Sequence, residues 1–384
     1  MTAAVMTDKA RRAGIAGAIA CTTIFALTVG LSFPLLSLVL EDQGTSEAAI
    51  GVNAAMTPLG IMIASPFYPR LIERFGSWQV AIGSLLLSAL LIVALGLTRS
   101  FGAFLVLRLM LGMADVGIFI VSETWINQLA RPETRGRVVG IYATALSVGF
   151  GAGPFTLALI GFQGFAPFAV GAACCVLAIG VVLAVRAHAP DVSDEAPVSP
   201  LGFLRRAPTL LAAICVYAFW EGAMLSLFPV FGLAAGLTVA VATSALSVAF
   251  LGNTVLQIPI GWLSDRSSRR QVMVLCAVLT ALGALLLPGL PDRLPLFLGV
   301  LFVFGATAGG LYTMAMSELG DRFSGSDLVA GNAAFAIAFG MGGMIGGPIT
   351  GAAMQLTGNG GFAGVLALIF AAMAALAYLR RRRG

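Results

Sequence analysis

The sequence predicts an all-α integral membrane protein with twelve transmembrane helices in two six-helix bundles. Three observations lead to this prediction. Of the 384 residues, 59% are hydrophobic and only 10% are charged, and the mean hydropathy of +0.98 is far above that of soluble domains. Apolar runs of about 20 residues, the length that crosses a bilayer, recur along the chain. Short sequence motifs of the first half also recur in the second half at a nearly constant offset in residue number.

Twelve apolar runs are long enough to span a membrane. The third and fourth runs, and the fifth and sixth, are joined by very few residues, so each pair is expected to form antiparallel neighbours. No room remains for a soluble domain. In chain order the runs lie at 14–38, 48–70, 78–98, 101–127, 137–160, 165–186, 209–232, 239–263, 271–290, 295–319, 328–352 and 361–379.

The first run follows the basic segment MTDKARR, as a signal sequence does. It continues to about Leu40, however, well beyond the 7 to 15 apolar residues of a typical signal core, and we interpret it as a retained first helix. The five cysteines fall inside apolar runs with no metal-type spacing, which predicts buried thiols and no metal site.

Lys and Arg residues are distributed unequally between the two sides of the predicted membrane. Nineteen of the 22 lie on the side that holds both termini, Arg99 and Arg293 lie on the other, and Arg108 lies within a span. Since cytoplasmic loops carry the excess of basic residues, we expect both termini to be cytoplasmic in a bacterial inner membrane. The same bias accounts for the net charge of +5, so nucleic acid is not an expected partner.

The longest polar and proline-bearing stretch, Ala187 to Phe203, separates the sixth span from the seventh. It predicts an N-terminal bundle over 1–186, a cytoplasmic linker over 187–207 and a C-terminal bundle over 208–384. Because each half holds an even number of spans, the two repeats would share one orientation in the membrane. This is the arrangement of a secondary transporter built from two bundles around a central cavity.

Four pairs of matching motif residues support an internal repeat. The residues of the first half recur in the same order in the second half, with offsets between 192 and 195 residues. Any one match is weak, but four in order are not expected by chance. The pairs are Pro34 with Pro229, Glu73 with Asp265, Glu123 with Glu318, and Pro154 with Pro348.

Over essentially its whole length the sequence resembles the major facilitator superfamily. The segment GWLSDRSSRRQV, with Asp265, Arg266, Arg269 and Arg270, looks like the family's loop signature between the second and third helices of a repeat. The first half departs from it in PRLIERFGSWQV. There Pro69 replaces a glycine, Glu73 an aspartate, and Ser77 and Trp78 a basic pair. The resemblance therefore implies that the gate of the first half is weaker or differently built.

Other motifs extend this resemblance. RLMLG, with Arg108 and Gly112, resembles the family's fourth-helix motif. GFGAGP resembles the fifth-helix motif associated with antiporters, but GMIGGPITG in the eleventh span matches that motif better, which reduces its value as a sign of antiport. The SETWIN ending of the fourth span and the RGR loop are most similar to a bacterial branch near the YcaD-like transporters.

Five ionisable residues lie inside predicted spans, where charge is costly and therefore points to function. They occupy only spans four, seven and ten, and in the resembled family helices one, four, seven and ten line the central cavity. They are Arg108, Asp115, Glu123, Glu221 and Glu318.

Asp115 and Glu221 are predicted to lie near the midplane, one in each bundle. Arg108, Asp115 and Ser122 are spaced by seven and share one helix face. With Arg108 and Trp220, the two acids form a candidate site for substrate or protons, because burial among apolar groups disfavours the charged carboxylate. The alternatives are structural: an ion pair of Asp115 with Arg108, or satisfaction of Glu221 by neighbouring helices.

Glu123 and Glu318 are expected near the cytoplasmic ends of their spans, where pairing with Arg74, Arg135, Arg137 or Arg322 would hold an inner gate. The polar residues Asn53, Asn253, Gln257 and Asn332 could contact substrate, but interhelical hydrogen bonds are the preferred interpretation. The full set of predicted gating residues is Glu73, Arg74, Glu123, Asp265, Arg266, Arg269, Arg270 and Glu318.

The glycine-rich segments are interpreted as helix-packing surfaces, since small residues let helix backbones approach closely. A Walker A loop requires a lysine, and the only lysine is Lys9. HExxH and GxSxG are also absent from the sequence. We therefore expect no enzyme and no cofactor. The packing residues are Gly149, Gly153, Pro154, Gly343, Gly347 and Pro348.

The sequence thus predicts a secondary active transporter that works by alternating access, with protons as the coupling ion. Efflux of a small amphipathic compound is favoured because the cavity spans offer many Met, Phe and Ala residues and few fixed polar groups. Uptake of a sugar or organic anion is the alternative, which Arg108 would suit if it faced a cavity. A non-transporting sensor or assembly protein on the same fold, and an intramembrane enzyme, are further hypotheses. Expected partners are the substrate, protons and the lipid bilayer, and the protein is expected to be monomeric.

Overall fold

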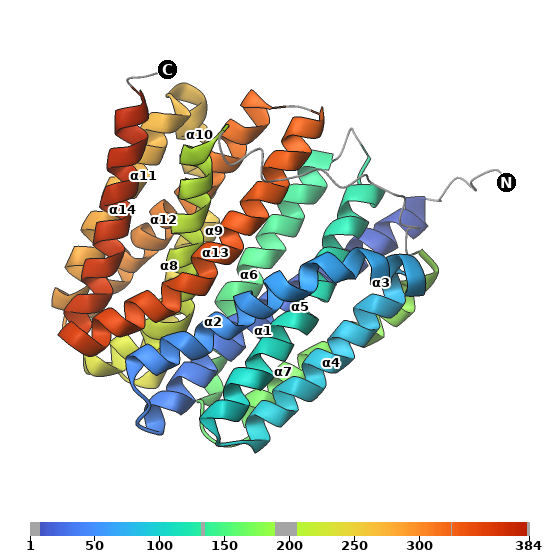
Figure 1. Ribbon diagram of the computed structural model, residues 1–384, viewed down its shortest axis with the longest axis horizontal. Coiled ribbons are helices and arrows are strands. Elements are labelled where there is room, and N and C mark those ends of the chain that lie inside the picture. The colour runs from blue at the N-terminus through green and yellow to red at the C-terminus, as the bar shows by residue number, and fades with distance from the viewer. Residues whose placement is uncertain (1–7, 132–134, 189–205, 324, 382–384) are drawn as a thin grey trace. The chain divides into compact units, whose positions relative to one another are not determined.

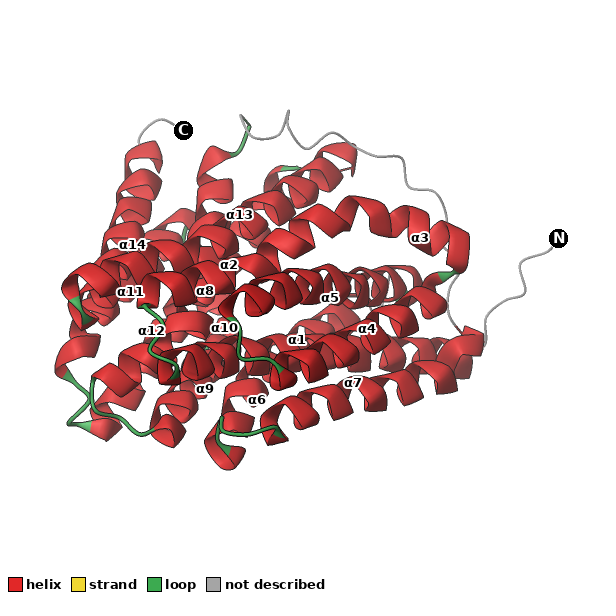
Figure 2. Ribbon diagram, turned by 60° about the horizontal axis from the view of Figure 1, so that its bottom comes forward, coloured by secondary structure: helices red, strands yellow, loops and turns green. Residues whose placement is uncertain are grey.

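The computed structural model describes residues 8–131, 135–188, 206–323 and 325–381, and these residues form helices and loops (Figure 2). Since the bilayer core holds no water, a chain that crosses it must satisfy its backbone hydrogen bonds internally, as a helix does. The helices are α1 (Asp8–Asp42), α2 (Glu47–Ala64), α3 (Tyr68–Phe75), α4 (Ser77–Leu97), α5 (Phe101–Leu129), α6 (Arg135–Ile160), α7 (Ala166–Val185), α8 (Pro208–Ala234), α9 (Val239–Val255), α10 (Gln257–Arg266), α11 (Arg269–Leu286), α12 (Leu294–Arg322), α13 (Gly325–Thr357) and α14 (Asn359–Arg381) (Figure 1).

Within the described residues, twelve helical segments are long and apolar enough to cross a membrane, which confirms the predicted number. Two of these spans contain two α-helices each. The second, Glu47–Phe75, contains α2, a short 3₁₀ turn over Ser65–Phe67, and α3. The eighth, Val239–Ser264, contains α9 and most of α10.

Prolines explain both interruptions. Pro66 and Pro69 fall at the turn between α2 and α3. Pro259 has no N–H to donate to the carbonyl of Val255, four residues earlier, and α9 ends at Val255. The second span of each sequence half is therefore broken in a corresponding place.

Loop glycines repeat the same internal correspondence. Gly44 after α1 and Gly236 after α8 have φ angles of 73° and 84° and lie 192 positions apart. Gly164 and Gly358, which precede α7 and α14, have φ angles of 71° and 63° and lie 194 positions apart. Only glycine adopts positive φ without steric cost, so the same special backbone state recurs at matching turns.

Internal contacts divide the chain into two compact units. Unit 1 comprises Met1–Ser32, Leu59–Gly153 and Phe162–Glu195, and unit 2 comprises Phe33–Pro58, Pro154–Gly161 and Ala196–Gly384. The chain passes from one unit to the other inside α1, α2 and α6, in each case within two residues of a helical proline: Pro34, Pro58 or Pro154. The division into bundles at the linker 187–207 stays a prediction.

Close helix pairs build the interior of each unit. In unit 1, α4 packs along α5 and α7, and in unit 2, α8 packs on α13, α9 on α12 and α11 on α14 (Figure 1). Glycine makes the α9/α12 approach possible. A Cβ added at Gly305 would lie 1.9 Å from the carbonyl oxygen of Ala249, and one at Gly252 would lie 1.9 Å from that of Phe302.

Replacing Gly305 by alanine is expected to destabilise the protein by about 1 to 3 kcal/mol, because the extra methyl forces α9 and α12 apart. Thermal unfolding of the purified protein measures this effect. Gly299 on the same helix is the matched control, since a Cβ there meets no atom within 4 Å. Gly299→Ala should leave the unfolding temperature unchanged or raise it, because alanine is the better helix former. Equal losses in the two variants would contradict this packing account.

Candidate functional site

Asp115 lies midway along α5 and is fully buried in unit 1. Ser88 of α4 donates a hydrogen bond of 2.7 Å to Asp115 Oδ1. Asp115 Oδ2 is buried and accepts no hydrogen bond within the described residues. No ion pair joins Asp115 to Arg108 in the described part of the chain, so the structural alternative considered from sequence is replaced by a hydroxyl partner. The carboxyl group faces α4 inside the unit.

Arg108 and Ser122, which share the predicted face with Asp115, are also buried, with exposed fractions of 1% and 0%. The Ser122 hydroxyl lies 3.3 Å from that of Tyr142 on α6, whereas Asp115 contacts α4. The common helix face therefore meets more than one neighbouring helix and is covered by them.

A connected polar network runs through unit 2 and begins at Glu221 of α8, which is 8% exposed. Tyr217, one turn earlier, donates to Glu221 Oε1 at 3.2 Å, and Asn253 of α9 donates to the Tyr217 hydroxyl at 3.3 Å. Gln257, the first residue of α10, donates to Asn253 Oδ1 at 3.0 Å and accepts from Thr313 of α12 at 2.6 Å. Asn253 and Gln257 thus form the interhelical hydrogen bonds that the sequence favoured, and they do so at the break between α9 and α10.

Gly309 of α12 leaves room for this network. A Cβ added there would lie 1.6 Å from Asn253 Oδ1 and 2.8 Å from Gln257 Nε2. The amide side chains therefore reach across to the α12 backbone, where Gln257 Nε2 also donates to the carbonyl of Ala306 at 3.1 Å.

Aromatic rings cover the Glu221 end of the network. The Tyr217 ring centroid lies 5.3 Å from that of Tyr312 on α12 and 6.2 Å from that of Phe339 on α13. We call Tyr217, Tyr312 and Phe339 the aromatic patch. Tyr312 is 38% exposed, so the patch forms part of the surface of unit 2.

Trp220, a predicted substrate contact, is placed differently. It is fully buried, and its ring lies 5.8 Å from Tyr217, 5.7 Å from Phe250 and 5.9 Å from Phe304, measured between centroids. In the described structure the Trp220 ring thus packs against α9 and α12 in the interior of unit 2. It contacts the aromatic patch through Tyr217.

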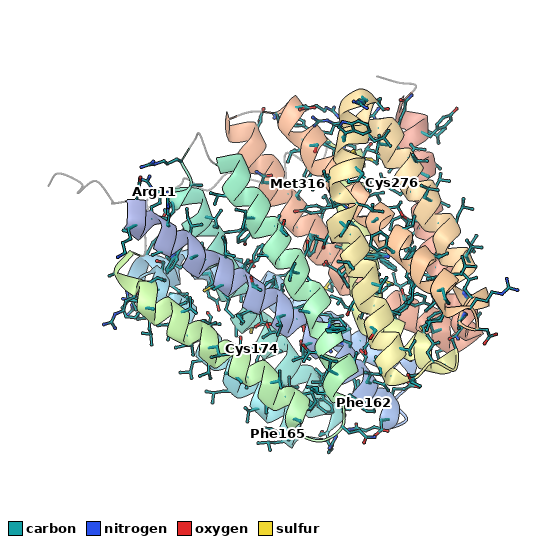
Figure 3. All side chains as sticks on the ribbon, turned by 180° about the vertical axis from the view of Figure 1, so that it is seen from behind. Arg11, Phe162, Phe165, Cys174, Cys276 and Met316 are labelled. Carbon is teal, nitrogen blue, oxygen red and sulfur yellow. The ribbon has the colours of Figure 1, made fainter. Side chains whose placement is uncertain are left out.

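Ion pairs join the start of α11 to the end of α12 in unit 2. Arg269 lies 2.7 Å from Asp321, and Glu318 lies 3.6 Å from Arg270 and 3.0 Å from Arg322. The Glu318 side chain is only 14% exposed, so water screens its two pairs less than it would screen a surface pair. Figure 3 labels Met316, two residues before Glu318, near this end of α12.

The matching junction in unit 1 is neutral. Trp125 near the end of α5 donates an indole hydrogen bond of 3.0 Å to Ser77 at the start of α4. Glu73, Arg74 and Glu123 are exposed and form no ion pair among the described residues. The degraded loop signature of the first half thus corresponds to a junction without charges.

Two further predicted gating positions are placed only in part. The Arg266 guanidinium lies over the Trp262 ring, 3.5 Å from its centroid. The side chains of Asp265, Arg135 and Arg137 lie outside the described residues.

Comparison with known protein families shows to which family the chain belongs. The family model for the Major Facilitator Superfamily matches residues 18–246 and 223–384. The chain belongs to the major facilitator superfamily. It is 27% identical over 337 residues to the uncharacterized MFS-type transporter YfkF of Bacillus subtilis (strain 168), which covers 86% of this chain and 85% of that protein. It is 23% identical over 334 residues to the MFS-type transporter Ent638_1421 of Enterobacter sp. (strain 638), with 86% of each chain covered.

Solved structures of superfamily members share the fold. A point mutant of the nucleoside transporter NupG superposes with a TM-score of 0.77 at 14% identity, covering 94% of this chain and 98% of that one. A bacterial homolog of the human lysosomal transporter Spinster, inward-facing and unoccupied, gives 0.71 at 15% identity, covering 97% and 96%. Since the homologues and the fold are those of transporters, this superfamily member is not an enzyme.

The five cysteines are free thiols, and Figure 3 shows Cys174 on α7 and Cys276 on α11. Cys21, Cys175 and Cys276 are buried as predicted, whereas Cys174 and Cys215 are half-buried. No cluster of three or more His, Cys, Asp or Glu side chains that could hold a metal occurs among the described residues.

Three of the four predicted packing glycines of this superfamily member, Gly149, Gly153 and Gly347, lie at close backbone contacts. In unit 1, a Cβ at Gly149 would meet the Thr23 carbonyl oxygen at 2.6 Å. In unit 2, a Cβ at Gly347 would meet the Gly51 carbonyl oxygen at 2.9 Å, whereas Gly343 has looser contacts, the nearest at 3.7 Å. Gly153 directly precedes Pro154 in α6, where the chain passes from unit 1 to unit 2. Gly347 likewise directly precedes a helical proline, Pro348 of α13, inside unit 2.

Sequence reasoning did not identify several residues of the two acid sites. Tyr217 could have been found, because it precedes Glu221 by four residues and shares its helix face. Ser88, Tyr312 and Thr313 carried no comparable signal, since each belongs to a different span from the acid or amide that it serves.

Proposed function

We propose that this superfamily member is a proton-coupled secondary active transporter that exports a small amphipathic compound, and that Glu221 is the acid that couples the proton to the substrate. The observation that supports the proposal most is the polar network of unit 2. It connects a buried carboxyl group to a phenol, two amides and a hydroxyl on four helices, and it ends beside a partly exposed aromatic patch.

Glu221 suits coupling because its partner is neutral. It makes no ion pair among the described residues, and its named hydrogen bond comes from Tyr217. No ion pair would have to break when Glu221 gains or loses a proton, and Tyr217 can donate to the neutral or the charged carboxyl group. A change of charge at Glu221 would be passed to Asn253 and Gln257 through the Tyr217 hydroxyl, which donates to Glu221 and accepts from Asn253.

Asp115 is the second candidate proton carrier. It has the same general design, a buried carboxyl group with one hydroxyl donor, but it is fully enclosed in unit 1. Because Tyr217, which donates to Glu221, contacts the partly exposed ring of Tyr312, we assign the substrate contact to Glu221 and any additional proton to Asp115.

The aromatic patch favours an amphipathic substrate with a planar or cationic group, which rings bind by stacking and by cation–π attraction. The alternative, uptake of a sugar or organic anion, relied on an accessible Arg108, and Arg108 is 1% exposed. The solved nucleoside transporter shares only the fold at 14% identity, so it does not select the substrate here.

We further propose that the protein acts as a monomer in the bacterial inner membrane with both termini cytoplasmic, as the distribution of Lys and Arg indicates. Alternating access would bend the chain at Pro34, Pro58 and Pro154, since helical prolines leave a backbone carbonyl without its donor and mark bending points.

Tyr312→Ala is expected to weaken binding of the substrate by about 5- to 30-fold, because loss of one ring contact removes about 1 to 2 kcal/mol. A thermal-shift screen of amphipathic cations, nucleosides, sugars and organic acids on the purified protein would first identify a stabilising compound. Its affinity would then be measured on the variant. Tyr378→Ala is the matched control, since Tyr378 is a similarly exposed tyrosine on α14. Stabilisation by sugars or organic acids alone, unaffected by Tyr312→Ala, would contradict the proposed substrate class.

A further inference from the structure

A cavity of about 270 Å³ lies at the end of unit 2 where α8 begins and α12 and α14 end. Four arginine residues from different segments line it: Arg206 before α8, Arg270 on α11, Arg322 on α12 and Arg380 on α14. The first turn of α8, Pro208 to Leu210, forms another wall. We call this the arginine pocket.

Carboxylates of the described residues neutralise these arginines only in part. Arg206 pairs with Asp327, and Arg270 and Arg322 share the single carboxylate of Glu318. Arg380 contributes its carbonyl oxygen to Arg270, and no carboxylate pairs with its guanidinium in the described part of the chain. Among the described residues, the four arginines that line the cavity thus pair with only two carboxylates, those of Asp327 and Glu318.

This surplus is costly for the protein alone, because like charges held within one pocket repel each other. A guanidinium group offers paired N–H donors that match the oxygens of a phosphate, and arginine clusters are the common receptors for such groups. The start of α8 adds the positive end of a helix dipole to the same wall. The chemistry of the pocket therefore suits a phosphate-bearing anion.

The surroundings indicate how such an anion would be presented. Tyr378 and Leu379, which immediately precede Arg380 on α14, are 45% and 62% exposed, and Leu275 on α11 is 46% exposed. Exposed apolar side chains thus lie near the arginines on two spans. A headgroup in the pocket with acyl chains along α11 and α14 would satisfy both kinds of surface.

We propose that the arginine pocket binds the phosphate group of an anionic phospholipid from the cytoplasmic leaflet. The choice of leaflet rests on the topology given under the proposed function, whereas phosphate recognition rests on the four guanidinium groups alone. The bound headgroup would compete with Glu318 for Arg270 and Arg322, and so would connect lipid composition to the ion pairs between α11 and α12.

Native mass spectrometry of the purified full chain, titrated with phosphatidylglycerol or with phosphatidylcholine, tests the proposal. We expect preferential retention of phosphatidylglycerol, and about tenfold weaker retention by Arg206→Gln/Arg380→Gln, as loss of charge-assisted hydrogen bonds predicts. This variant leaves Glu318 and its partners intact. The matched control is Arg70→Gln/Arg74→Gln, which removes two exposed arginines of unit 1 and should retain the lipid as the unchanged protein does.

A second arm uses inorganic phosphate and the unfolding temperature. Stabilisation by phosphate that the pocket variant loses, without any preference for phosphatidylglycerol, would keep the phosphate site and overturn its lipid source. Equal retention of both lipids by all proteins, with no phosphate effect, would overturn the proposal entirely. Should the double variant fold poorly, Arg380→Lys serves instead: it keeps the charge, loses the paired donors, and should reduce retention by a smaller factor. None of these readouts uses transport, so their failure is distinguishable from failure of the proposed function.

Discussion

Replacing Glu221 by glutamine is expected to abolish accumulation of substrate driven by a pH gradient while leaving downhill exchange. A gradient of one pH unit sustains about tenfold accumulation for each coupled proton, and the variant should fall to about onefold. The reason is chemical: glutamine can still accept the hydrogen bond from Tyr217 but cannot exchange a proton. Flux of the identified substrate in proteoliposomes, with and without the gradient, measures both quantities.

Two comparisons separate coupling from structure. Asp292→Asn alters an exposed acid in the loop before α12 that makes no ion pair among the described residues, and it should leave both fluxes unchanged. A purely structural Glu221 predicts a different result, namely poor expression and a lower unfolding temperature with no selective loss of the driven flux. Asp115→Asn, tested alongside, shows whether the acid of unit 1 carries a second proton or only holds Ser88.

The second large effect is expected at the junction of α11 and α12. Glu318→Gln removes two ion pairs and leaves Arg270 and Arg322 close together, which should destabilise the junction by about 1 to 2 kcal/mol. Amide hydrogen exchange at the start of α11 and the end of α12 should then accelerate by about 5- to 30-fold. High salt should reproduce part of this acceleration in the unchanged protein, since screening weakens ion pairs.

Unit 1 provides the complementary test. Trp125→Phe should loosen the corresponding junction of α4 and α5, because it removes the neutral hydrogen bond to Ser77. Here the exchange rates should be insensitive to salt. If Glu318→Gln and Trp125→Phe each loosened both junctions, the two junctions would not be built from the different chemistry that we assign to them.

Much of the fold follows from local sequence. Apolar runs and loop charges predict the twelve spans because the bilayer imposes a length and a polarity on each helix. The helix break at Leu256 could also have been predicted from sequence, because Pro259 cannot donate a hydrogen bond to the carbonyl of Val255. Hydropathy alone did not indicate the break, since the apolar run over 239–263 is continuous. Hydropathy reports burial, and it does not report backbone continuity.

The site was harder to predict. Helical periodicity predicts a common face for Arg108, Asp115 and Ser122, but it does not predict which helices cover that face. Ser88 and Tyr142 come from different spans. Trp220 was chosen for its position next to Glu221, yet adjacent residues of a helix point in different directions, and its ring lies in the core. Tyr312 is supplied by another helix, and such a partner is fixed only by three-dimensional packing.

Transport by reconstituted protein tests the central claim most directly. Proteoliposomes with an imposed pH gradient, supplied with the compound found by thermal shift, should accumulate it against its own gradient, and a protonophore should collapse the accumulation. Equilibration of the compound to equal concentrations on both sides, unchanged by the pH gradient and identical for Glu221→Gln, would contradict proton-coupled transport by this protein.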